Sequence, residues 1–174
     1  MSATAVRAAL RGYMWKTVQY QRAQSNWVYD EVRPLPIAHL LPSVPATIRS
    51  DCSFGCKLLC HAAGAPDPTG MGYDGYGNSV SIFEHLPTPA VLRLPGDIVV
   101  WGPDVHAAMI YSVGRDNSDT WLWNMGSQGE PVFRTLAQEI AGHPGIGYWA
   151  RETVRPDPTA TIAGNPPAAA RGIR

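Results

Sequence analysis

The chain has little charge and no long apolar run. Only 16% of its 174 residues are charged, and 14 Lys and Arg balance 14 Asp and Glu. A neutral chain lacks the basic surface that nucleic-acid binding requires. We find no run of about 18 apolar residues and so expect no membrane span. The first fifteen residues lack the apolar core and cleavage site of a signal peptide, so we expect the product to begin in the cytoplasm.

Cysteine is also scarce, with only Cys52, Cys56 and Cys60 present. Their spacing of four places them on one helix face, and we expect Cys56 and Cys60 to be core residues. Such a spacing suits neither a disulfide framework nor the usual zinc ligands. We therefore expect no metal, and nucleophilic chemistry by a cysteine needs no cofactor.

The chain is long enough for one domain, and a hydrophobic content of 45% is enough for a core. We place this domain at residues 1–152. The segment 153–174 is rich in proline and alanine, and we expect it to be a flexible tail. An apolar stripe predicts a helix over about 4–24, whereas the prolines of 33–45 predict an irregular connection.

Cys52 follows Asp51, a good helix-capping residue, and the segment after it ends at Gly64. The pattern predicts a helix over 52–63 with Cys52 in its first turn. Backbone N–H groups and the helix dipole favour negative charge there, so we expect a lowered thiol pKa. Cys52 is the candidate nucleophile.

Downstream of a turn-rich loop at 64–78 and a short helix at 79–86, the chain is rich in strands. Apolar, β-branched segments at 98–101 and 105–113 flank turn residues and predict a hairpin with His106 early in its second strand. Further strands are expected at 120–124, 131–134 and 146–150. We expect most of the tryptophans to lie in the core.

These motifs together resemble the NlpC-type papain-like cysteine peptidases. Asp-Cys-Ser opens a helix, Pro-Gly-Asp precedes an apolar strand, and a histidine begins the next strand. The resemblance covers about residues 15–150 and is greatest to peptidoglycan-hydrolase modules of actinobacterial bacteriophages, which have stretches similar to 63–73 and 126–131.

The resemblance implies an α+β papain-like fold, with the nucleophile helix packed on an antiparallel sheet of about five strands. It also implies a cysteine endopeptidase or amidase that cleaves peptidoglycan stem peptides or cross-bridges. Cys52 would attack, His106 would transfer the proton, and Asn124 would orient His106. The Cys52 N–H and Tyr20 would bind the oxyanion, with Tyr29 as an alternative to Tyr20.

Four residues are expected to contact the substrate. Ser53 follows the nucleophile, Asp67 and Tyr73 belong to the loop at the rim of the groove, and Gln128 follows the third catalytic position. The expected partners are bacterial peptidoglycan and, for a virion-mounted form, phage virion or tail proteins. The site of action would be the cell wall, reached from the host cytoplasm as a free lysin or in the virion.

Two positions depart from the family pattern and keep alternatives open. Phe54 stands where the family has glycine and would narrow access to the thiol, and Met125 stands where related phage modules have histidine. Asn124 and Met125 should face opposite sides of their strand, and Gln128 is a further candidate for the third position. A catalytically impaired module that serves a structural or wall-binding role is the alternative function. Acyl transfer to a non-peptide substrate is a third reading.

Overall fold

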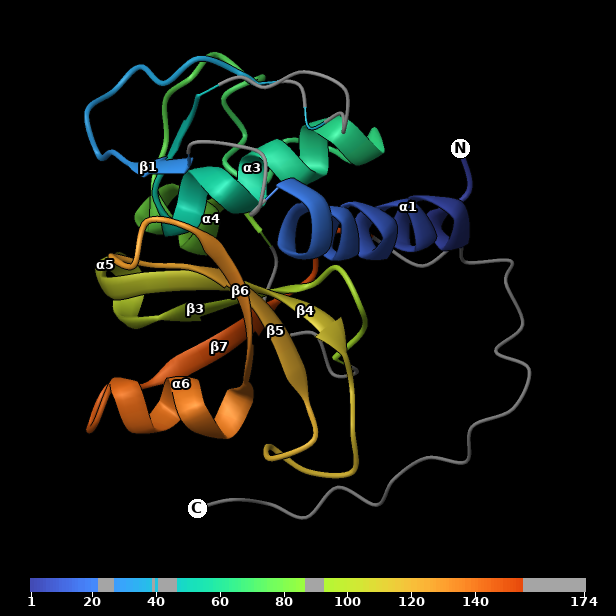
Figure 1. Ribbon diagram of the computed structural model, residues 1–174, viewed down its shortest axis with the longest axis vertical. Helices are drawn as coiled ribbons and strands as arrows, with labels where there is room; N and C mark the ends of the chain where they lie inside the picture. The colour runs from blue at the N-terminus through green and yellow to red at the C-terminus, as the bar shows by residue number, and fades with distance from the viewer. Residues whose placement is uncertain (22–26, 39, 41–46, 87–92, 155–174) are drawn as a thin grey trace.

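The protein is an α+β fold in which helices cover both faces of one antiparallel sheet (Figure 1). The computed structural model describes residues 1–21, 27–38, 40, 47–86 and 93–154. Most of the expected tail therefore lies outside the described residues. Within these ranges, no helix combines the length and apolar character needed to cross a membrane.

The sheet has five strands in the order β6-β5-β4-β3-β7, all antiparallel. The strands are β3 (Ile98–Trp101), β4 (His106–Ser112), β5 (Trp121–Met125), β6 (Pro131–Thr135) and β7 (Tyr148–Arg151). This confirms the predicted strand number, and each strand coincides closely with an apolar, β-branched or aromatic segment of the sequence.

One face of the sheet carries α3 (Cys52–Ala63) and α1 (Ala3–Lys16), and Figure 1 shows both on the same side. Cys56 and Cys60 are fully buried in this core, as predicted from their spacing. The helix lies close to the sheet because position 55 is glycine: a Cβ there would lie 2.5 Å from the Trp123 ring. Such a distance is well inside van der Waals contact.

The opposite face carries α6 (Leu136–Gly142), a helix that we did not predict. Thr135 and Gln138 form a capping box at its start, which is a sequence signature that could have revealed it. Leu136 packs against Val99, Ala108, Ile110 and Leu122 in a second, smaller core. Ala108 and Ile110 of β4 therefore face α6, whereas Ala107 and Met109 face α3.

A separate two-stranded parallel sheet leads into the nucleophile helix. It pairs β1 (Trp27–Tyr29) with β2 (Ile48–Ser50), and Tyr29 lies opposite Ser50. Two short helices, α4 (Ser79–His85) and α5 (Gly102–Val105), lie near the start of α3. The hairpin between β3 and β4 is thus closed by a helical turn rather than by the simple turn expected.

The Pro-Gly-Asp motif makes a buried turn before β3. The Asp97 carboxylate accepts a hydrogen bond of 2.8 Å from the Leu94 N–H and an ion pair of 2.8 Å from Arg7 of α1. Gly96 has φ of +93° in the left-handed region, where glycine is favoured. The motif therefore joins α1 to the start of β3, an inner strand of the sheet, and does not itself line the candidate site.

The helix boundaries differ from the prediction in detail. Ser2 caps α1, which begins one residue before the predicted start, and Asn78 caps α4. The regular α-helix ends at Lys16 and continues as a π-helical turn, η1 (Thr17–Gln21), and the last three residues of the predicted helix, 22–24, lie outside the described residues. In η1, the Thr17 hydroxyl bonds the Met14 carbonyl at 2.9 Å and accepts the Trp123 indole N–H at 2.8 Å.

Candidate active site

Cys52 occupies the first turn of α3, as expected, and Asp51 is the N-cap. One Asp51 carboxylate oxygen accepts the Phe54 N–H at 2.7 Å and the Ser53 hydroxyl at 2.8 Å. The other oxygen pairs with the Arg33 guanidinium. Because all these groups are largely buried, the start of the nucleophile helix is rigidly held.

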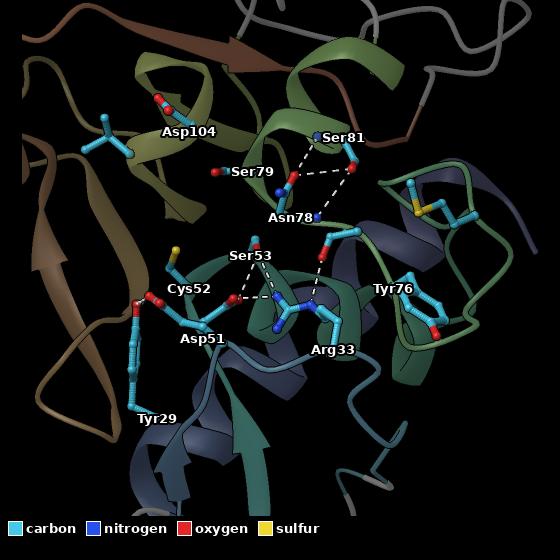
Figure 2. Close-up of a pocket in the computed structure, with 14 residues that line it drawn as sticks. Tyr29, Arg33, Asp51, Cys52, Ser53, Tyr76, Asn78, Ser79, Ser81 and Asp104 are labelled. Carbon is cyan, nitrogen blue, oxygen red and sulfur yellow. Dashed lines mark hydrogen bonds and ion pairs between the residues drawn. The ribbon is translucent and has the colours of Figure 1, made fainter.

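The Cys52 thiol lines a polar pocket of about 450 Å³ (Figure 2). That volume lies within the range of small-ligand sites. Four segments form the pocket: the end of β1 with the chain after it, the start of α3, the loop before α4 together with its first turn, and α5. The lining residues are Tyr29, Glu31, Arg33, Asp51, Cys52, Ser53, Met71, Tyr76, Gly77, Asn78, Ser79, Ser81, Asp104 and Val105.

The pKa of Cys52 departs from our expectation. Burial, together with the charge of Asp51, raises it to about 11. The backbone N–H groups of Ala107, Ser53 and Cys52 act in the opposite direction but do not outweigh burial. The expectation of a lowered pKa was therefore wrong, because desolvation of the thiolate exceeds the favourable effect of the helix N-terminus. At neutral pH the thiol is protonated.

Tyr29 is the tyrosine that the structure places beside the nucleophile. Pairing of β1 with β2 brings it next to the Ser50–Cys52 segment, and its hydroxyl donates a hydrogen bond of 2.7 Å to Glu31. Burial raises the pKa of Tyr29, and the hydrogen bond to Glu31 and the charges of Cys52 and Asp51 add to this shift. The Tyr20 side chain lies outside the described part of the chain, so its predicted role stays a prediction.

His106 does not lie in this pocket. It is the first residue of β4 and pairs with Trp101, on the face that carries α6. Its ring stacks on His143 at 5.0 Å between centroids, and its Nε2 lies 3.5 Å from Glu139 Oε2. Burial lowers the pKa of His106 to about 3, helped by the positive charges of His143 and Arg134.

The structure therefore does not bring the predicted pair together. Cys52 lies at the face covered by α3, and the neighbour of His106, Ala107, is the residue of β4 that approaches the sulfur. Strand alternation accounts for the difference, because residues 106 and 107 point to opposite faces. A one-residue offset, which the sequence pattern could not resolve, leaves the Ala107 N–H rather than the His106 imidazole at the thiol.

Asn124 and Met125 also alternate, as predicted. Met125 belongs to the core beneath α3, and Asn124 lies on the face of β5 that carries Leu122 and packs on α6. Asn124 thus shares a face with His106 and not with Cys52. Its Oδ1 is buried and has no hydrogen-bond partner among the described residues.

Glu139 and His143 are polar residues of this cluster that sequence reasoning missed. Four buried polar atoms there lack hydrogen-bond partners within the described ranges: Trp101 Nε1, His106 Nε2, Asn124 Oδ1 and Glu139 Oε1. The Glu139 carboxylate faces His106, His143 and Arg134, the last at 3.6 Å. Because we did not use the capping box to predict α6, Glu139 was not assigned to a helix. Nothing else in the sequence relates Glu139 to His106.

Of the four predicted substrate contacts, only Ser53 lines the pocket. The oxygens of Asp67 accept the N–H groups of Thr69, Met71 and Tyr73, so this carboxylate organises its own loop. The Tyr73 hydroxyl bonds the Ala65 carbonyl at 2.8 Å. Gln128 is exposed and donates to the Glu130 carbonyl at 3.1 Å.

Lys57 explains how that loop is fixed. Its side chain is completely buried in α3, and its Nζ lies 3.3 Å from Asp67, 3.4 Å from Asp74 and 2.7 Å from the Tyr76 carbonyl. The glycine-rich loop that supplies the rim of the pocket is therefore held to the nucleophile helix. The sequence did not indicate that Lys57 holds this loop, because nothing in a single lysine among apolar helix residues identifies its distant partners.

Phe54 points into the core and is not among the residues that line the pocket. The Arg33 guanidinium covers its ring, 5.2 Å from the centroid. The ring therefore packs against Arg33. We had expected Phe54 to narrow access to the Cys52 thiol, and this expectation was wrong because the ring points away from the pocket.

Across the described residues, no three or more His, Cys, Asp or Glu side chains gather in a way that could hold a metal ion. Comparison of the chain with protein-family models, with curated proteins and with solved structures finds no match in any of the three.

Proposed function

We propose that this protein binds a peptidoglycan stem peptide or cross-bridge in the Cys52 pocket and hydrolyses it as a cysteine endopeptidase or amidase. One observation carries the proposal: a partly buried thiol in the first turn of a capped helix lines a polar pocket of about 450 Å³. The pocket size suits a short peptide, and a thiol at a helix N-terminus suits nucleophilic attack. The motif resemblance supplies the identity of the substrate.

The reaction would follow the two steps of thiol proteases. Cys52 Sγ attacks the peptide carbonyl carbon, and the Cys52 N–H stabilises the developing oxyanion. The Tyr29 hydroxyl adds a second hydrogen bond once its single proton turns from Glu31 to the oxyanion. Collapse of the tetrahedral intermediate breaks the C–N bond, and the leaving amine takes up the proton that the thiol lost to the base. Water then hydrolyses the thioester, which frees the acid and restores the thiol.

The thiol proton must leave during attack, because a pKa of about 11 keeps Cys52 protonated at neutral pH. In the proposed mechanism His106 accepts it. The imidazole starts across β4 from the sulfur, one residue from Ala107, so the start of β4 has to turn His106 out of its position at Glu139. This turn is a required step of the proposal.

A second function, binding to the wall without cleavage, is favoured by that same separation. In a structural or wall-binding module, such as a phage virion or tail protein, the pocket would hold the peptide and His106 would remain at Glu139. Fold and pocket are compatible with both functions.

Digestion of purified actinobacterial peptidoglycan, followed by mass analysis of the released fragments, tests the proposal. A hydrolase should release peptides whose masses identify one cleaved bond, and Cys52→Ala should release none. Cys56→Ala is the matched control, since Cys56 is buried in the core. Release that persists in Cys52→Ala would remove the thiol from the chemistry.

A further inference from the structure

His106 is enclosed on the face of the sheet opposite Cys52, and Figure 1 shows α6 and α3 on these two faces. Its ring centroid lies 5.5 Å from that of Trp101 and 5.0 Å from that of His143, which is stacked on it at an angle of 15°. Glu139 Oε2 lies 3.5 Å from the His106 Nε2. Within this enclosure His106 is only 6% exposed.

Two of the three enclosing residues belong to the end of α6. Glu139 lies in its last turn, and His143 is its C-cap residue. The His143 backbone N–H donates to the Glu139 carbonyl at 3.1 Å, and the His143 ring Nδ1 lies 2.9 Å from the same oxygen. These contacts hold the two residues together, so a displacement of α6 would move both away from the imidazole.

The enclosure leaves its polar atoms unpaired. The His106 Nε2 is buried and, within the described residues, has no hydrogen-bond partner, even at Glu139. Trp101 Nε1, Asn124 Oδ1 and Glu139 Oε1 are in the same condition. Because buried polar groups without partners destabilise the arrangement that contains them, these four atoms would gain hydrogen bonds to water if the enclosure opened. Ring stacking and burial keep the imidazole in place, and its release breaks no hydrogen bond of Nε2.

The backbone at His106 is weakly anchored. His106 and Trp101 form the end pair of the β3–β4 ladder, next to the four-residue helix α5. The N-cap of α5 makes no side-chain hydrogen bond, and its last residue, Val105, is 44% exposed. Short helical turns and ladder ends open at low free-energy cost. Only this end pair has to open for the imidazole to turn to the face where Cys52 lies.

We propose that α6 is an autoinhibitory element: Glu139 and His143 are positioning residues that hold the His106 imidazole away from Cys52, and displacement of α6 releases it. The inference rests on the proposed function and adds the regulation of its base. While the imidazole is held, no base takes the thiol proton. After release, the proton passes from the Cys52 Sγ to the imidazole, and the thiolate and imidazolium form an ion pair. Turnover therefore depends on the fraction of molecules in which α6 has moved.

The pH dependence of Cys52 alkylation by iodoacetamide tests this inference without substrate. His143→Ala removes the stacked ring, and Glu139→Ala removes the carboxylate while retaining a good helix former. In each variant the midpoint of the rate profile should fall from about 11 to below about 8, because an imidazolium beside the sulfur stabilises the thiolate. The rate at neutral pH should rise about tenfold or more.

Two controls separate release of the imidazole from general loosening of the helix. Ile140→Ala removes an apolar contact of α6 with the smaller core and leaves the residues around His106 intact, so its profile should equal that of the parent. Adding His106→Gln to His143→Ala should restore the profile of the parent, because a glutamine side chain cannot accept the thiol proton.

An unchanged profile in both alanine variants, or a lowered midpoint that persists after His106→Gln, would overturn the inference. These results are separable from failure of the proposed function. Cys52-dependent hydrolysis of peptidoglycan with an unchanged profile would leave the hydrolase standing and remove the inhibition. A lowered midpoint that depends on His106, without release of wall peptides, would retain the control of the thiol by α6 and remove the hydrolase.

Discussion

The Cys52 thiol and the His106 imidazole lie on opposite sides of β4, although the N–H of Ala107, adjacent to His106, approaches the sulfur. The thiol faces a polar pocket, and the imidazole is enclosed by Trp101, Glu139 and His143. Because the two groups are separated, the pKa of the Cys52 thiol and the pKa of the His106 imidazole can be measured independently.

Thiol reactivity should identify Cys52 and report its raised pKa. In alkylation with iodoacetamide, Cys52 should react before Cys56 and Cys60, which are fully buried. Its rate should be low at pH 7 and rise toward a pKa of about 11, since only the thiolate reacts. Mass mapping of the labelled peptides provides the measurement. Faster labelling of Cys60, or a plateau in rate below pH 8, would contradict the description of the pocket.

Acid should destabilise the protein through His106. Its pKa is about 3 when folded and near 6.5 when unfolded, so the unfolded chain binds the extra proton between these values. The stability from neutral His106 is therefore complete above about pH 6.5 and is lost as pH falls toward 3. The slope should approach about 1.4 kcal/mol per pH unit.

Denaturant unfolding between pH 4 and 7 measures this slope. In His106→Gln the slope should decrease by the contribution of one proton, about 1.4 kcal/mol per pH unit. In His85→Gln the slope should equal that of the parent, because His85 is exposed on α4. Identical slopes in the His106 variant and the parent would show that His106 is not held neutral in the folded protein.

Removal of the Lys57 charge should loosen the loop at the rim of the pocket. Lys57→Met leaves Asp67 without its buried cation, and loss of one partner of a buried pair typically costs about 3–5 kcal/mol. Lys16→Met is the control at an exposed position. Hydrogen exchange should show faster exchange of the Tyr73 N–H, which Asp67 binds, in the Lys57 variant alone. Unchanged exchange there would argue against the proposed clamp.

Two glycine substitutions should have opposite effects. Gly55→Ala places a Cβ 2.5 Å from the Trp123 ring, and overpacking of this kind costs about 1–3 kcal/mol. Gly12→Ala in α1 meets no atom within 4 Å and should stabilise its helix by about 0.5–1 kcal/mol. Thermal unfolding of the two variants compares them directly. A stabilised Gly55→Ala protein would mean that α3 lies farther from the sheet.

Much of the fold could be predicted from local sequence. The bounds of α3 follow from its N-cap, Asp51, and its C-terminal glycine, Gly64, and its buried face follows from the spacing of the cysteines. Each strand of the sheet coincides with an apolar or β-branched segment. The face of His106 could not be predicted, because one residue of strand register reverses it. The Lys57 cluster and the Glu139 cluster depend on long-range contacts that a single sequence does not display.

The central claim is that Cys52 cleaves a peptide held in its pocket. The most direct measurement incubates the protein with insoluble peptidoglycan and records two quantities from one sample, the protein bound to the pellet and the peptide released to solution. The account predicts that the parent binds and releases peptide, whereas Cys52→Ala binds and releases none. Binding by the parent with no release above that of Cys52→Ala would contradict it and establish a wall-binding module.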